Sequence, residues 1–161
     1  MVLERRRKRN FSHAQAQKPT ADPQLLQVVG EIAADAFAAE AIVLAAADVI
    51  EQAARSVKDG LHDGAAAEHA QIAAAQAKVA VDRFAHETAS RLFDAGGASA
   101  TQATYNLDRH WRNARTASTH NPTFAKATAV AITTSMAKRR AKRLFLRGSR
   151  PRSVDGFYYN G

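Results

Sequence analysis

Apolar side chains between residues 22 and 58 recur at spacings of four and three residues, the pattern of a helix that packs in a bundle. Asp22 followed by Pro23 supplies an N-cap and a proline at the first helical position, so we expect the helix to begin there. A second apolar set widens the surface to be buried, which suits a helix packed on two sides or at a subunit interface. The first set is Leu25, Val29, Ile32, Ala36, Ala39, Val43, Ala46, Ile50, Ala54 and Val57, and the second is Leu26, Ala33, Phe37 and Leu44.

The same periodicity predicts three more helices. One covers residues 65–95 and is rich in alanine, which favours helix and close packing. The others cover residues 103–120 and 123–146. No stretch alternates polar and apolar residues over the length of a strand, so the predicted fold class is all-α, an antiparallel helical bundle.

The helix over 103–120 has a buried stripe that includes Trp111, the only tryptophan of the chain, and a separate polar face. On the polar face, Asp108 precedes Arg112 by four residues and is expected to pair with it. Arg109 and Arg115 have no carboxylate after them before Asp155, so some of these cations are available to an anionic partner, while at least one arginine of the helix is expected to pair with the acidic helices. The stripe is Leu107, Trp111, Ala114 and Ser118.

Two turns flank this helix and carry candidate chemistry. Pro122 disfavours helix just before it, so we expect His120 in the final turn or just past it, where a histidine either caps the helix or handles protons. Gly96 and Gly97 form at least a helix C-cap and a tight connection. Glycines also allow backbone amides to approach a phosphate or a flavin ring closely, at the start of the next helix.

Charge divides the chain into three parts. The net charge is +8, but residues 1–18 carry about +5, residues 19–108 about −8 and residues 109–161 about +11. We therefore expect a basic N-terminal segment over 1–21, a helical bundle domain over 22–131 and a basic C-terminal tail over 132–161.

Several function classes are disfavoured by composition. There is no cysteine, and neither an HExxH motif nor the Glu-x-x-His pairs of di-iron bundles occur, so no metal site is expected. The longest apolar run, residues 36–47, contains Glu40 and is too short to span a bilayer. No hydrophobic segment follows the early RRRKR run, as a secretory signal requires, so we expect a cytoplasmic protein with no membrane partner.

The segment LDRHWRNARTASTHNP, residues 107–122, resembles the C-terminal helical domain of the acyl-CoA dehydrogenase superfamily. It is most similar to the reduced-flavin-dependent monooxygenases of that superfamily, the group that contains dibenzothiophene monooxygenase. The resemblance continues through LFDAGGASAT, residues 92–101, and DPQLLQVVGEIAADAFAAEAIVL, residues 22–44. Altogether it covers roughly residues 5–122.

This resemblance implies a domain of a flavin-dependent monooxygenase that takes reduced FMN from a partner flavin reductase and oxygenates a small substrate, with sulfur compounds among the candidates. It also implies that the loop at Gly96 and Gly97 and the helix bearing Arg109 and Arg112 bind the cofactor. In such enzymes this loop often reaches the flavin of a neighbouring subunit, so a homo-oligomer is expected. His120 is then the catalytic residue, lying beside the flavin and helping it to react with oxygen.

Two alternatives stay open. An acyl-CoA dehydrogenase would bind FAD and use a glutamate just after this helix, but no carboxylate occurs between Arg109 and Val154, which disfavours dehydrogenation. The other alternative is a non-enzymatic basic helical protein that binds nucleic acid through its tail. Residues 138–152 hold eight lysines or arginines, enough for salt-sensitive association without sequence specificity.

The chain departs from the family it resembles. Family members have an N-terminal helical domain and a middle β-domain that contribute much of the flavin pocket, and this chain enters at the end of the first helix of the bundle. We therefore expect a bundle that is one helix short and a protein that is inactive alone. A truncated or internally initiated copy would explain both features.

Overall fold

The computed structural model describes residues 18, 21–58, 60–61 and 63–148, with the backbone alone for residues 140–148. Four α-helices account for most of this part: α2 (Pro23–Arg55), α3 (Gly64–Gly96), α4 (Asp108–His120) and α5 (Thr123–Gly148). Two short 3-10 helices, η2 (Ala98–Thr101) and η3 (Ala103–Tyr105), lie between α3 and α4. Apart from one isolated bridge between Lys58 and Leu61, the described residues form no β-structure. The predicted all-α class is confirmed.

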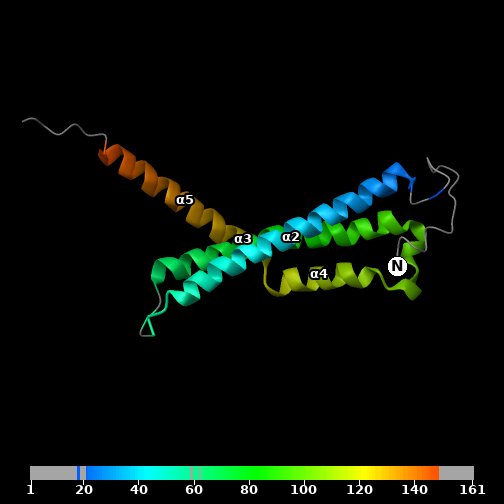
Figure 1. The fold of residues 1–161 in the computed structure, drawn as a ribbon, viewed down its shortest axis with the longest axis horizontal. Coiled ribbons are helices and arrows are strands. Elements are labelled where there is room, and N and C mark those ends of the chain that lie inside the picture. The colour runs from blue at the N-terminus through cyan, green and yellow to red at the C-terminus, as the bar shows by residue number, and fades with distance from the viewer. Residues whose placement is uncertain (1–17, 19–20, 59, 62, 149–161) are drawn as a thin grey trace, which may run out of the picture.

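Helices α2 and α3 form an antiparallel hairpin that is the longest feature of the molecule (Figure 1). Each begins at an aspartate whose side chain accepts backbone N–H groups: Asp22 from Gln24 at 2.9 Å, and Asp63 from Ala65 at 2.9 Å. Pro23 occupies the first turn of α2, as the sequence predicts. Alanines dominate the buried positions, which lets the two helix backbones approach closely. The buried alanines of the hairpin are Ala46, Ala70, Ala75, Ala77, Ala89 and Ala95.

The hairpin is also tied together by polar side chains. Arg91 of α3 reaches two carboxylates of α2, Glu31 at 3.3 Å and Asp35 at 3.4 Å. Thr88 donates a hydrogen bond to the same Asp35 carboxylate at 3.4 Å. These side chains are only partly exposed, so the contacts fix the register of α2 against α3.

The third predicted helix begins later than expected. Gly97 has a φ of 69°, and its N–H donates to the Phe93 carbonyl at 2.7 Å, which ends α3. The chain then turns through η2 and η3, and Asn106, with a φ of 46°, adopts the left-handed conformation that asparagine tolerates. This residue interrupts the helical path, so α4 begins at Asp108 and not at Ala103.

Helices α4 and α5 follow one another back along α3 (Figure 1). α4 packs beside the later half of α3, and the first part of α5 packs beside the earlier half before α5 diverges from the hairpin (Figure 1). Asn121 and Pro122 form the turn between them, as predicted from the proline. α5 crosses residues 131 and 132 without a break, and the proposed division into three segments stays a prediction. The N-terminal segment, residues 1–17 and 19–20, and the end of the tail lie outside the described residues.

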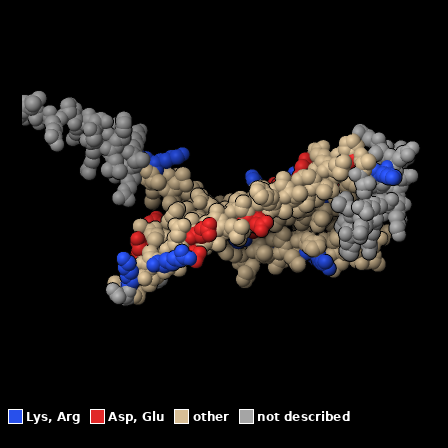
Figure 2. Space-filling model, in the orientation of Figure 1, with Lys and Arg blue, Asp and Glu red and all other residues tan. Residues whose placement is uncertain are grey.

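Two sets of side chains that the sequence predicts to be buried are exposed. Trp111 is 43% exposed, although Leu107 and Ser118 of the same stripe are buried. The reason is that α3 is the main neighbour of α4, and one neighbouring helix covers a stripe too narrow for the large Trp111 ring. On α2, Leu26, Phe37 and Leu44 are exposed, with Phe37 74% exposed. Val43 and Ile50 of the first apolar set are exposed as well, because α3 is the main neighbour of α2 among the described residues and covers only a narrow stripe. Broad uncharged areas on one face of the molecule are visible in Figure 2.

Within the part of the chain that the structure describes, no helix is both long enough and apolar enough to cross a bilayer. The same residues contain no group of three or more histidines, cysteines or carboxylates placed to hold a metal ion.

Candidate functional site

His120 is the last residue of α4 and lies at the end of an open groove along one side of that helix, with a volume of about 540 Å³. We call this the His120 groove. It is lined by an aromatic ring, two arginines, a histidine and two hydroxyl groups. These residues are Trp111, Arg112, Arg115, Thr116, Thr119 and His120. The position of His120 in the final turn agrees with the prediction from Pro122.

Arg112 is fixed in place at the start of the groove. Its guanidinium pairs with Asp108 one turn earlier, as the spacing predicts, and donates to Asn106 Oδ1 at 3.0 Å. The pair is half exposed, so it orients Arg112 more than it stabilises the fold. Arg115 makes no ion pair with any described residue, which leaves its charge available in the middle of the groove.

The five residues predicted from the sequence to form the site fall into two groups. Arg112 and His120 line the same groove. Gly96 and Gly97 lie at the end of α3, and Arg109 lies at the start of α4, roughly 16 Å along the helix axis from His120 by helix geometry. The N–H of Gly97 is engaged by the Phe93 carbonyl, so it serves the helix cap. Arg109 has no ion pair among the described residues.

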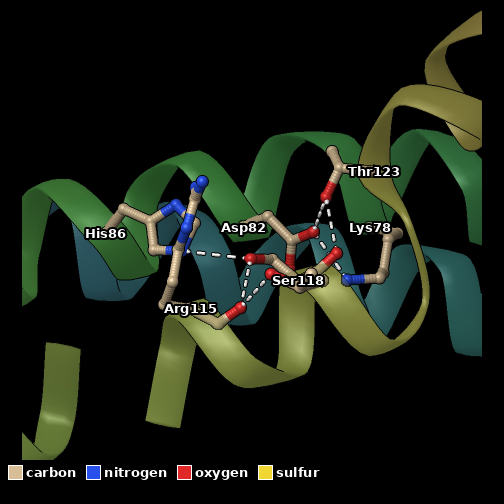
Figure 3. Close-up of polar contacts among 7 residues, drawn as sticks. Lys78, Asp82, His86, Arg115, Ser118 and Thr123 are labelled. Atoms are coloured by element: carbon tan, nitrogen blue, oxygen red, sulfur yellow. Dashed lines mark hydrogen bonds and ion pairs between the residues drawn. The ribbon is translucent and has the colours of Figure 1, made fainter. Parts of the chain in front are cut away.

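A network of polar side chains holds the end of α4 and the start of α5 against α3 (Figure 3). Lys78 and Asp82 pair across one turn of α3 at 2.6 Å, with side chains only 21% and 15% exposed. The Thr123 hydroxyl, at the first position of α5, donates to the same Asp82 oxygen and lies 3.5 Å from the Ser118 carbonyl. The carboxylate of Asp82 therefore links α3 to the start of α5, three residues after His120.

The second half of the network joins α3 to α4. The Ser118 hydroxyl donates to the Arg115 carbonyl at 3.0 Å and lies 3.2 Å from Nε2 of His86 (Figure 3). A serine has a single hydroxyl proton, and Ser118 donates it to the Arg115 carbonyl. In the contact between Ser118 and His86, Nε2 of His86 therefore carries the proton and donates it to the Ser118 oxygen. The sequence analysis did not identify His86, Asp82 or Ser118 as part of a site.

A second groove opens where α3, α4 and the turn before α5 meet, and we call it the junction groove. Its volume is about 580 Å³. It shares Arg115 and Thr119 with the His120 groove and adds side chains of α3 and of the turn. The added side chains that matter below are Val79, Asp82, Arg83, His86, Pro122 and Phe124.

Comparison with known proteins connects this fold with one family. The sequence profile of the acyl-CoA dehydrogenase C-terminal domain matches residues 1–125, which include α2, α3, α4 and the first residues of α5. A curated relative, the probable FMNH2-dependent monooxygenase SfnC of Pseudomonas putida, is 42% identical over 79 residues. That match covers 46% of this chain and 20% of the relative.

Solved structures similar to this chain are also those of monooxygenases. Methanesulfinate monooxygenase MsuC from Pseudomonas fluorescens superposes with a TM-score of 0.70 and 30% identity, over 81% of this chain and 35% of that protein. FMN-bound TdsC from Paenibacillus sp. A11-2 superposes with a TM-score of 0.69 and 31% identity, over 81% of this chain and 34% of that protein. TdsC is also described as a dibenzothiophene monooxygenase. The chain thus spans about a third of these solved relatives.

Proposed function

Because this chain belongs to the acyl-CoA dehydrogenase C-terminal domain family, we propose that it provides the helical part of the flavin site of a reduced-FMN-dependent monooxygenase. The similar proteins support this proposal, since they include an FMNH2-dependent monooxygenase and a structure with FMN bound. The observation that carries it is the His120 groove, which gathers an aromatic ring, two guanidinium groups and an imidazole along one helix.

The residues of the groove fit one side of a flavin. Arg115, which has no ion pair among the described residues, and Arg112 offer N–H donors to a phosphate or to ring oxygens. The exposed Trp111 offers an apolar face on which a flat ring system can stack. In this proposal the exposure of Trp111, which the sequence pattern did not predict, is the feature that makes the groove suitable for an aromatic cofactor.

His120 is proposed as the proton-handling residue of this site. The bound reduced flavin would supply the electrons with which oxygen is activated. An imidazole at an open helix end can both accept and donate a proton, and His120 is exposed in the groove where it can do so. The turn at Asn121 and Pro122 and the Asp82 network hold the backbone on either side of it.

The substrate is proposed to be a small molecule, with sulfur compounds as the first class to examine. Two similar solved proteins are named for methanesulfinate and dibenzothiophene. We propose that a flavin reductase supplies the reduced cofactor in the cytoplasm. Gly96, Gly97 and Arg109, which lie away from the His120 groove, are proposed to contact flavin at the other end of α4, with the flavin of a second subunit as the first candidate.

Dehydrogenation with FAD is the weaker proposal. A dehydrogenase needs a carboxylate base near the end of α4, where this chain has His120, Asn121 and Pro122. Asp82 is a carboxylate close to this turn, but Lys78 and Thr123 engage it, so it is held as an ion pair and is poorly placed to abstract a proton.

Trp111 is the only tryptophan of the chain, so its fluorescence reports directly on the groove. Reduced FMN titrated without oxygen should quench it saturably, with a dissociation constant on the order of 100 µM or weaker for so open a site. Riboflavin, which lacks the phosphate, and the Arg115→Gln variant with FMN should both bind less tightly. Quenching that rises linearly, as for free N-acetyltryptophanamide, would exclude a flavin site at this groove.

A further inference from the structure

The junction groove gathers basic side chains beside the proposed flavin site and shares one of them, Arg115, with it. Arg83 and His86 of α3 and Arg115 of α4 line it together. None of the three makes an ion pair with any residue in the described part of the chain. Two guanidinium groups and an imidazole in one hollow favour an anion, because a cleft lined by one sign of charge attracts the opposite sign.

The one carboxylate that lines the groove does little to oppose an anion. Asp82 is paired with Lys78 at 2.6 Å and also accepts the Thr123 hydroxyl. Its side chain is 15% exposed, so most of its surface is turned toward these partners. The charge left facing the groove is therefore that of Arg83 and Arg115.

The opposite part of the groove is apolar. Val79, Pro122 and Phe124 line it, and Phe124 is 76% exposed. A large aromatic side chain in such a position gains free energy when an apolar group covers it. A ligand that satisfies both parts has an anionic head and an apolar body.

Two of these three side chains are already oriented. The Arg83 guanidinium lies over the Phe84 ring, 5.1 Å from its centroid. Nε2 of His86 is held by Ser118 at 3.2 Å (Figure 3). Side chains that are fixed before binding lose less conformational entropy when a ligand arrives.

We propose that the junction groove binds a small organic carboxylate with an aromatic or aliphatic body, at Arg83, His86 and Arg115. The body lies against Val79, Pro122 and Phe124. This site is distinct from the His120 groove and does not depend on the flavin proposal, although the two share Arg115 and Thr119. Occupation of the junction groove would draw Arg115 away from the His120 groove, so the two sites are expected to compete for that side chain.

The test is an NMR titration of the ¹⁵N-labelled full chain with benzoate at low ionic strength, without flavin. Backbone amide signals of residues 79–86, 123 and 124 should shift saturably, with a dissociation constant of roughly 1 mM, as is usual for so small a ligand. Benzamide, the neutral molecule of the same shape, should bind much more weakly. Arg83→Gln should weaken benzoate binding about threefold to fivefold, the size expected for one exposed ion pair, and Phe124→Ala by a similar factor.

Matched control variants distinguish binding in the junction groove from binding in the His120 groove. Arg112→Gln alters only the His120 groove and should leave benzoate binding unchanged. Arg83 and Phe124 are exposed, so their variants should keep the helical circular dichroism of the parent. The proposal is overturned by equal binding of benzamide, by shifts centred on Trp111 and Arg112, or by the absence of saturable shifts up to about 20 mM benzoate.

Discussion

The carboxylate of Asp82 ties α3 to the start of α5, close to the turn that follows His120. One oxygen of this group accepts from Lys78 within α3 and from Thr123 at the start of α5. Because the Lys78 and Asp82 side chains are only 21% and 15% exposed, water replaces these contacts poorly. Loss of the charge would leave Lys78 partly buried without its partner.

Asp82→Asn should therefore lower the free energy of unfolding by about 1–3 kcal/mol, the range for removing one partner of a part-buried charged contact. Urea denaturation followed by circular dichroism measures this change. Asp48→Asn is the matched control, since Asp48 is exposed and makes no hydrogen bond or ion pair with a described residue; it should change stability by less than about 0.5 kcal/mol. Equal effects of the two substitutions would show that the Asp82 contacts do not stabilise the junction.

At the scale of elements, the sequence predicts helices from local signals and misses features set by distant contacts. Asp22, Pro23 and Pro122 act on their own neighbours, so the starts of α2 and α5 are predictable. The late start of α4 depends on the left-handed conformation of Asn106, which asparagine permits but does not require.

The polar network that joins α3 to α4 and α5 could not be predicted from the sequence either. Lys78 and Asp82 are visible as a pair four residues apart, but Thr123 lies 41 positions from Asp82, and Ser118 lies 32 positions from His86. Only the fold brings such residues together, because no periodicity of a single helix relates them. For the same reason, the sequence placed Arg112 and His120 on one helix, where they line one groove, and did not indicate the junction groove.

Two glycines, Gly97 just after α3 and Gly30 inside α2, should respond to alanine in opposite ways. Gly97 ends α3 with φ 69° and ψ −176°, a region of backbone space almost restricted to glycine, so Gly97→Ala should lower the free energy of unfolding by about 1–3 kcal/mol. Gly30 lies inside α2, and a methyl group there would meet nothing within 4 Å. Gly30→Ala should raise the free energy of unfolding by roughly 0.5–1 kcal/mol. Thermal or urea unfolding of both variants checks the pair, and destabilisation by both would contradict these backbone assignments.

At the scale of the whole molecule, the described part of the chain leaves much apolar surface in contact with water. Leu26, Phe37 and Leu44 on α2 are more than half exposed, and their spacing places them along one side of the helix. Such a face commonly lies at an interface between proteins. Association of two or more copies through α2 therefore stays a prediction.

Light scattering at high protein concentration should show a mass above that of one chain, 17.4 kDa. Phe37→Glu should shift the protein toward the monomer, because a charge at the centre of an apolar interface opposes its burial. Ala45→Glu, at an exposed α2 position outside this apolar set, should leave the mass unchanged. A parent protein that remains monomeric at millimolar concentration would refute the prediction.

The basic C-terminal tail gives rise to a separate prediction about nucleic acid binding. Nucleic acid binding through residues 138–152 stays a prediction, and it requires an affinity that falls steeply as salt is raised. A shortened chain that ends at Thr128 should lose this binding. Sequence-specific binding retained by the shortened chain at physiological salt would favour the nucleic-acid reading over the flavin proposal.

The central claim, that reduced FMN meets this domain beside His120, is tested most directly by the proton NMR signals of the imidazoles. The chain has six histidines, and a His120→Gln variant identifies the signal of His120. Anaerobic addition of reduced FMN should shift that signal saturably, in step with the quenching of Trp111, and leave the exposed His69 of α3 unaffected. A His120 signal that stays in place while FMN binds elsewhere, or while no binding occurs, would contradict the claim.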